Sequence, residues 1–223
     1  MNLAPRGGVR DWGPRATGLP HVLPTTLHPF PSSRRMAAWL RIEGSLSARI
    51  ASVSGRLQVR VLRQGPVRLH PAEAARLRCP ASAHAHGREV LLVADGVPVV
   101  YARSVLQAVH ARGTWKAIRG LGNRALADLL FGLPAPQRSG FEFARFAPGS
   151  QIATSVHRRW REATGTDWGR REVWARCSVF TRRDAPLLVT ECFAPAIAAF
   201  DAPQRARAVP WRAPAPRPSS GQP

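Results

Sequence analysis

Residues 88–105, with the sequence REVLLVADGVPVVYARSV, restrict the fold of this chain more than any other segment. Two runs rich in valine and leucine flank the dipeptide Asp95-Gly96. This dipeptide is favoured in two-residue turns between antiparallel strands, because both central positions of such a turn need positive φ angles. The segment therefore predicts a β-hairpin, and any fold proposed for the chain has to contain it.

The remaining segments predict an antiparallel sheet with a few helices. Apolar residues recur at helical spacing in residues 36–52 and 113–131, although glycines interrupt both, and 150–164 is typical of a short helix. Strands and helices do not alternate as they do around a parallel sheet, so we expect one domain of the α+β class. The other segments with strand character are 56–63, 141–147, 171–180 and 186–193.

The two ends of the chain differ in composition from the part between them. Residues 1–35 and 203–223 contain six prolines each, out of 21 in the chain, and few large apolar residues. Such segments bury too little apolar surface to offset the entropy of ordering, so we predict that both are disordered and that the domain spans 36–202. Met36 could be the true start of translation, in which case residues 1–35 are not translated.

The net charge of +20 comes from 32 arginines and one lysine, Lys116, against 13 acidic residues. The basic residues of a nucleic-acid-binding protein gather on one face or along one helix. Here they are spread along the whole length, so the charge does not by itself indicate a nucleic-acid partner.

The sequence also predicts the compartment in which the protein resides. No run of about 18 or more apolar residues is present, so no membrane-spanning helix is predicted. Met1 to Arg15 lacks the apolar core of a secretory signal peptide, and we therefore expect a cytoplasmic protein.

The cysteines do not indicate a disulfide framework or a zinc ribbon. Cys79, Cys177 and Cys192 are odd in number and widely spaced. Cys79 lies near His84 and His86 in a loop rich in proline, alanine and serine, but no fourth ligand follows at a standard spacing. We therefore predict no metal site. The sequence also lacks the G-x-S-x-G, Walker A and H-E-x-x-H motifs.

Two charged residues at the ends of apolar strands are the candidate site residues. Arg88 opens the first strand of the hairpin, and Glu191 lies near the end of PLLVTECF. Alternation places Glu191 on the same face as Val189 and Phe193, with Thr190 on the other face. Glu191 is then either an outward charge, a partner of a nearby arginine, or a carboxylate inside a pocket, where burial demands a partner or a changed protonation state.

Four motifs, in order and at compatible spacing, resemble those of the chorismate lyase (chorismate–pyruvate lyase) family. The hairpin resembles the family pattern R-E-[IV]-L-L-x-A-D-G-x-P followed by [AG]-R-[ST], which Ala102-Arg103-Ser104 matches. Two departures are Cys177, where the family usually has a second arginine, and Ala127, where it has glycine. The other matching segments are 44–49, 121–131, and 174–178 followed by 186–195.

This resemblance implies a fold and a reaction. The fold is a monomeric α+β domain with a highly twisted antiparallel sheet of about six strands, and helices cover an enclosed ligand site as flaps. The reaction is the elimination of pyruvate from chorismate to give 4-hydroxybenzoate, the aromatic precursor of ubiquinone. The resemblance implies neither a metal nor an organic cofactor.

The resemblance also assigns the site residues. Arg88 matches the arginine that meets the ring carboxylate, Leu46 and Leu126 match residues whose backbone N–H groups help to hold it, and Glu191 matches the glutamate on the 4-hydroxyl side. The chemistry agrees, because chorismate carries two carboxylates and a guanidinium forms short, bidentate bonds to such a group. Whether Glu191 acts as an acid, as a base or only in positioning stays open.

Two other functions fit parts of the sequence. The first is a small-ligand-binding domain of the same fold without catalysis, as in effector-sensing domains of bacterial transcription regulators. Those proteins place a winged helix-turn-helix of about 60 to 70 residues in front, and residues 1–35 are too short and too rich in proline for it. The second is a basic nucleic-acid-binding protein, whose affinity would fall steeply with salt.

Overall fold

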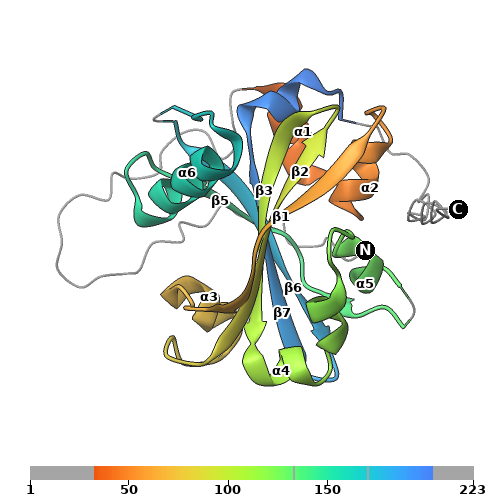
Figure 1. The fold of residues 1–223 in the computed structure, drawn as a ribbon, viewed down its shortest axis with the longest axis vertical. Coiled ribbons are helices and arrows are strands. Elements are labelled where there is room, and N and C mark those ends of the chain that lie inside the picture. The colour runs from red at the N-terminus through yellow and green to blue at the C-terminus, as the bar shows by residue number, and fades with distance from the viewer. Residues whose placement is uncertain (1–32, 133, 170, 203–223) are drawn as a thin grey trace, which may run out of the picture.

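The predicted hairpin supplies two neighbouring strands of a seven-stranded antiparallel sheet (Figure 1). The computed structural model describes residues 33–132, 134–169 and 171–202. The strand order is β1-β2-β3-β7-β6-β4, and β5 also pairs with β6. The predicted α+β class and antiparallel sheet are confirmed.

The turn of the hairpin has the expected conformation. Strands β2 (Ala85–Ala94) and β3 (Val97–Gln107) are joined by Asp95 and Gly96, with φ angles of 48° and 82°. The Asp95 carboxylate also accepts hydrogen bonds from the backbone N–H groups of Arg56, at 2.7 Å, and Gly55, at 3.1 Å. Asp95 therefore joins the turn to the segment that leads into the next strand.

The other predicted strands form close to their expected bounds. The first is longer than predicted, because its pairing with β2 continues as far as Val67 opposite Ala85. The strand β4 was not predicted, since two residues are too short to show alternation. The strands are β1 (Leu57–Val67), β4 (Gln137–Arg138), β5 (Glu142–Phe146), β6 (Val173–Arg182) and β7 (Ala185–Phe193).

The helical pattern in residues 36–52, which Gly44 and Ser45 were expected to interrupt, forms two short helices. Helix α1 (Arg34–Arg41) begins two residues before the predicted domain boundary, because the Ser33 side chain caps it by accepting from the Met36 N–H. Helix α2 (Leu46–Ala51) begins after Ser45, as expected for an N-cap serine. Residues 1–32 and 203–223, which make up most of the two ends predicted to be disordered, lie outside the described residues.

The helical pattern in residues 113–131 is broken more than expected. The structure has α4 (Ala108–Arg112), the 3₁₀-helix η1 (Lys116–Gly120) and a single turn, α5 (Ala127–Leu130). Gly122 has a φ of 52°, a conformation that ends a right-handed helix. The remaining helices are α3 (Pro71–Arg76), α6 (Gln151–Thr164) and η2 (Pro195–Ala199), of which only α6 was predicted.

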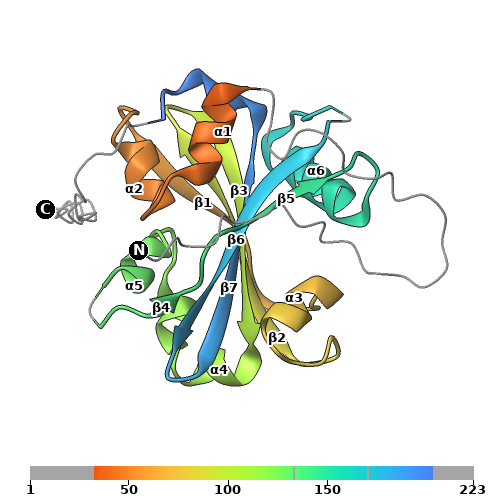
Figure 2. The same ribbon diagram turned by 180° about the vertical axis from the view of Figure 1, so that it is seen from behind.

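Helices cover both faces of the sheet, which is strongly twisted (Figures 1 and 2). We call the face covered by α3 and α6, which lie on the left in Figure 1, the rear face. The opposite face, covered by α1, α2, α4 and α5, is the front face. One apolar cluster lies on the rear face, and two lie on the front. None of the helices in the described ranges is long and apolar enough to cross a bilayer.

Candidate functional site

The four residues singled out from the sequence line one cavity of about 60 Å³ on the front face. Leu46 begins α2, Arg88 lies on β2, Leu126 precedes α5, and Glu191 lies on β7. The cavity lies between the two front clusters, since its lining includes Leu46 and Val90 of the first and Leu130 and Val189 of the second. Segments far apart in the sequence therefore meet here.

Alternation along the central strands explains which side chains reach the cavity. Arg88, Ala102, Ser104 and Glu191 line it. The register pairs Arg88 with Ser104 and Ala102 with Glu191, so these four lie together on the front face. Thr190 lines a different cavity on the rear face, which confirms the predicted alternation in β7.

Arg88 carries a buried positive charge that no described carboxylate balances. The residue is 2 % exposed, and Nη2 donates to the carbonyl oxygens of Gly122 and Arg124, both at 2.9 Å. Nε has no hydrogen-bond partner in the described part of the chain. Burial lowers the pKa of Arg88 to about 10, so the group is still protonated at neutral pH. Such a cation favours an anionic ligand.

Two residues at helix starts, Leu46 and Leu126, also line the cavity. Leu46 is the first residue of α2, and Leu126 precedes the single turn of α5. Neither of their backbone N–H groups has a hydrogen-bond acceptor among residues 33–132, 134–169 and 171–202. Groups at helix starts have no partner within the helix, so both are available to a ligand carboxylate.

Glu191 is both a cavity residue and one partner of an ion pair. Its Oε2 accepts from Arg176 Nε at 2.6 Å, and Arg176 also donates to the carbonyl oxygens of Leu40, at 3.2 Å, and Ile42. Arg176 is fully buried, whereas the Glu191 side chain is 17 % exposed. No hydrogen bond to Oε1 is formed within the described residues. Glu191 is therefore both the partner of a nearby arginine and a carboxylate inside a cavity. The interpretation of Glu191 as an outward charge is wrong.

Arg138 also lines the front cavity, and the sequence did not point to it. It lies on the two-residue strand β4 and lines the cavity, where Nε donates to Ser178 Oγ at 3.2 Å. Its guanidinium lies 4.0 Å from the centre of the Phe141 ring. Burial, assisted by Arg176, lowers the pKa of Arg138 to about 10. No carboxylate in the described ranges lies within 4.0 Å of its nitrogen atoms.

The departures at Cys177 and Ala127 have different consequences. Cys177 faces the rear cluster, and burial raises the pKa of its thiol to about 12. It therefore adds no charge to the front cavity. Ala127 does line the cavity. The described residues contain no group of three His, Cys, Asp or Glu side chains that could hold a metal ion.

The comparison with known sequences shows the family of the chain. The family described as Chorismate lyase matches residues 24–202. A "Probable chorismate pyruvate-lyase" from Albidiferax ferrireducens is 47% identical over 160 residues, which cover 70% of this chain and 79% of that protein. The protein of the same name from Azoarcus sp. strain BH72 is 41% identical over 170 residues, which cover 76% and 88%.

The solved structures show the fold. PhnF from Mycobacterium smegmatis superposes with a TM-score of 0.53 at 17% identity, over 75% of this chain and 71% of that chain. At this identity the likeness concerns the fold alone. The family model, in contrast, matches residues 24–202, and the two relatives are 47% and 41% identical over at least 70% of this chain, so the chain belongs to the chorismate lyase family.

Proposed function

We propose that this protein is a chorismate lyase, which eliminates pyruvate from chorismate to give 4-hydroxybenzoate for ubiquinone biosynthesis. The observation that carries the proposal is the charge of the front cavity. Arg88 and Arg138 both line it, and neither forms an ion pair with a described carboxylate. Chorismate carries two carboxylates, so its charge matches that of the two guanidinium groups.

Each carboxylate has its own partners in this proposal. Arg88, with the free N–H groups of Leu46 and Leu126, binds the ring carboxylate. Arg138 binds the carboxylate of the enolpyruvyl group. Charge-assisted bonds in a cavity shielded from water are stronger than in solution, so they fix the substrate in one orientation.

Glu191 then faces the carbon atoms that react. Its Oε1 takes the proton from ring carbon 4, and the electrons of that C–H bond form the last double bond of the aromatic ring. The C3–O bond breaks, and its electrons leave with the enolpyruvyl oxygen. Protonation at the methylene carbon gives pyruvate. Arg176 holds the carboxylate in place through Oε2. Because aromaticity drives the step, positioning and electrostatics supply most of the acceleration.

The roof of the cavity has to open for this reaction. At about 60 Å³ the cavity is far smaller than the roughly 300 Å³ of the smallest common ligand pockets. Helix α2 and the segment around α5 both contribute residues to its lining. Substrate entry and product release therefore require these two segments to separate.

Incubation of the purified chain with chorismate tests the proposed function. We expect 4-hydroxybenzoate and pyruvate in equal amounts, measured by chromatography and by a coupled lactate dehydrogenase assay. Saturable binding of chorismate without either product would favour the non-catalytic ligand-binding domain instead. Absence of binding would overturn both functions. We also expect a cytoplasmic monomer that needs no cofactor.

Replacing Arg138 with glutamine separates its substrate role from a structural one. We expect the KM for chorismate to rise about 10- to 100-fold, because one charge-assisted carboxylate contact is lost. The affinity for 4-hydroxybenzoate changes by less than about twofold, since this product lacks the enolpyruvyl carboxylate.

Steady-state kinetics and calorimetry measure the two quantities. Arg60→Gln, at an exposed arginine on β1, is the matched control and leaves both unchanged. Equal losses of substrate and product affinity in Arg138→Gln would contradict the assignment and indicate a structural role.

A further inference from the structure

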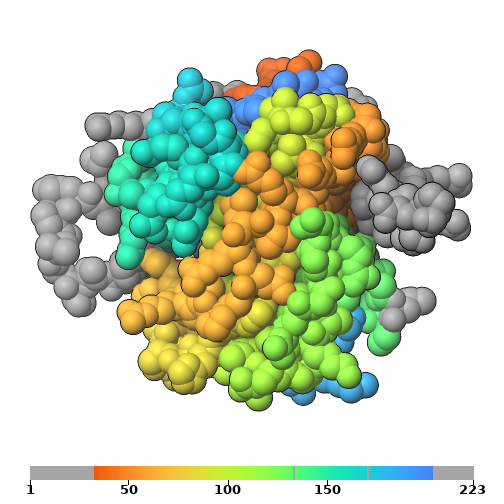
Figure 3. All heavy atoms as spheres, viewed as in Figure 1, coloured from red at the N-terminus to blue at the C-terminus, as the bar shows by residue number. Residues whose placement is uncertain are grey.

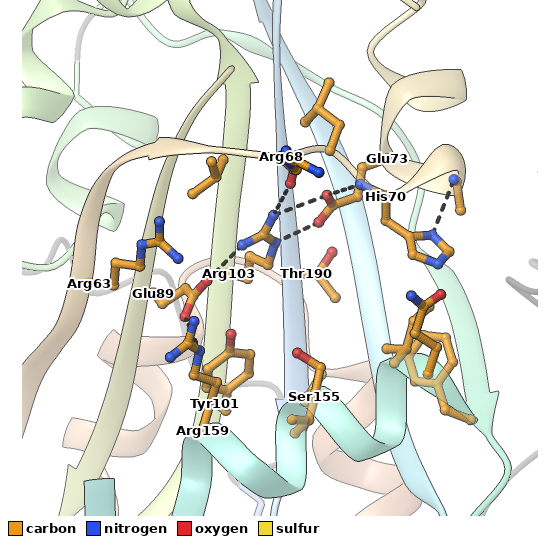
Figure 4. Close-up of a pocket in the computed structure, with 18 residues that line it drawn as sticks. Arg63, Arg68, His70, Glu73, Glu89, Tyr101, Arg103, Ser155, Arg159 and Thr190 are labelled. Atoms are coloured by element: carbon orange, nitrogen blue, oxygen red, sulfur yellow. Dashed lines mark hydrogen bonds and ion pairs between the residues drawn. The ribbon is translucent and has the colours of Figure 1, made fainter. Parts of the chain in front are cut away.

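A second and larger cavity, of about 520 Å³, lies on the rear face of the sheet (Figure 4). Strands β2, β3 and β7 form its floor, while β1, α3 and α6 form its walls. In the space-filling view the surface of α6 meets that of β1 and α3 along this side of the molecule (Figure 3). The volume falls within the range of pockets that bind small organic molecules.

The middle of the sheet thus carries a cavity on each face. Glu89, Arg103 and Thr190 line the rear cavity, and each is the chain neighbour of a residue that lines the front one: Arg88, Ala102 and Glu191. The backbone of one sheet separates the two cavities. The rear cavity is therefore a separate site and not an extension of the front one.

The carboxylates of the rear cavity are already bound by arginines. Arg103 lies between Glu73 and Glu89, with Nε–Oε1 and Nη1–Oε1 distances of 2.7 and 2.6 Å (Figure 4). Arg159 approaches Glu89 from α6, at 3.5 Å. Both acidic side chains are at least nine-tenths buried. This network keeps the floor rigid and leaves no free carboxylate there to repel an anion.

Two further arginines give the rear cavity an excess of positive charge. Arg63 and Arg68 line it from β1 and the segment after β1, and both are exposed. Neither forms an ion pair with a carboxylate in the described residues. Four guanidinium groups and two carboxylates line the cavity, so its net charge is +2 with His70 neutral.

Apolar and hydroxyl groups make up the rest of the lining. Val67, Leu69, Phe146 and Ile152 are among the apolar residues. Ser155 lines the cavity from α6, and Thr190 lies at the middle of its floor (Figure 4). A ligand that fits such a lining has an apolar body and a polar, negatively charged end.

We infer that the rear cavity is a second binding site, specific for a small organic monocarboxylate with an apolar body. Arg63 and Arg68 attract the carboxylate, and the apolar wall holds the body. A phosphate has no apolar part to use that wall. This inference does not depend on the reaction proposed for the front cavity.

Fluorine NMR titration with 4-fluorobenzoate tests the site. Ser155→Trp fills the cavity from an exposed position of α6, and Thr154→Trp is the matched control, since Thr154 is exposed and does not line the cavity. We expect Ser155→Trp to lose a 4-fluorobenzoate site that wild type and Thr154→Trp keep. Thermal unfolding verifies that both variants fold. Equal binding by the two variants, or no saturable binding below about 10 mM in wild type, would overturn the inference.

The chemical class is tested with two further probes and one variant. Neutral 4-fluorobenzamide should not occupy the site, and inorganic phosphate should not displace 4-fluorobenzoate from it. The Arg63→Gln/Arg68→Gln variant should bind 4-fluorobenzoate about fivefold more weakly, while Arg60→Gln binds it as wild type does. Equal binding of the benzamide, or displacement by phosphate, would contradict a site for organic carboxylates.

Discussion

Replacing Glu191 with glutamine lowers kcat for chorismate roughly 10²- to 10⁴-fold and changes substrate affinity only modestly. The amide keeps the shape of the side chain but cannot take the proton from ring carbon 4. Steady-state assays of 4-hydroxybenzoate formation measure the decrease in kcat. Glu162→Gln is the control, because Glu162 is an exposed glutamate on α6 that lines neither cavity.

The same substitution affects stability through Arg176. This buried guanidinium loses the carboxylate that it contacts at 2.6 Å, and breaking a buried pair costs about 3–5 kcal/mol of unfolding free energy. The double variant Glu191→Gln/Arg176→Met removes both charges, so we expect it to regain most of the stability and none of the activity. If Glu191→Gln retained the wild-type kcat, Glu191 would only position the substrate or pair with Arg176.

Local signals predicted those parts of the fold in which neighbouring residues decide the structure. Asp95-Gly96 determined the hairpin turn, and alternation in residues 186–193 correctly placed Glu191 and Thr190 on opposite faces. The pattern in 113–131 was less informative, because its leucines have helical spacing while Gly122 adopts a φ that a helix does not allow. Periodicity alone cannot show whether the spacing of the leucines or the glycine decides the local structure.

Contacts between segments that are far apart in the sequence decide which residues line the front cavity. Leu46 and Leu126 have no polar side chain, so only the resemblance to a family brought them to attention. Arg138 was one of 32 arginines, and it reaches the cavity through a strand of two residues. Its position in the cavity follows from the pairing of β4 with β6, which no local pattern predicts.

The rear cavity depends on register in the same way. Glu89 and Arg103 lie directly opposite each other in the hairpin, and this pairing brings their charges together. In the sequence they are two charged residues within apolar strands. The cavity above them forms only because α3 and α6 cover that face, and α3 was not predicted.

Replacing Arg88 with methionine reduces the affinity for 4-hydroxybenzoate by about 2–5 kcal/mol, since the cation that binds the ring carboxylate is lost. Methionine keeps the length and apolar stem of the side chain. Burial lowers the pKa of Arg88 from 12.5 to about 10, which corresponds to a cost of about 3 kcal/mol for the cation in the folded protein. The variant avoids this cost.

The effect of Arg88→Met on stability is therefore much smaller than its effect on binding. The two hydrogen bonds to Gly122 and Arg124 are lost, at about 1–1.5 kcal/mol each. This loss roughly offsets the cost that is avoided, so the unfolding free energy of the ligand-free variant should be within about 1 kcal/mol of the wild-type value or above it. Calorimetric titration and chemical unfolding measure the two quantities, with exposed Arg60→Met as the control. A large loss of stability with unchanged product affinity would show that Arg88 serves the fold. The expected result shows that the fold tolerates an unfavourable buried charge at this position because the ligand needs it.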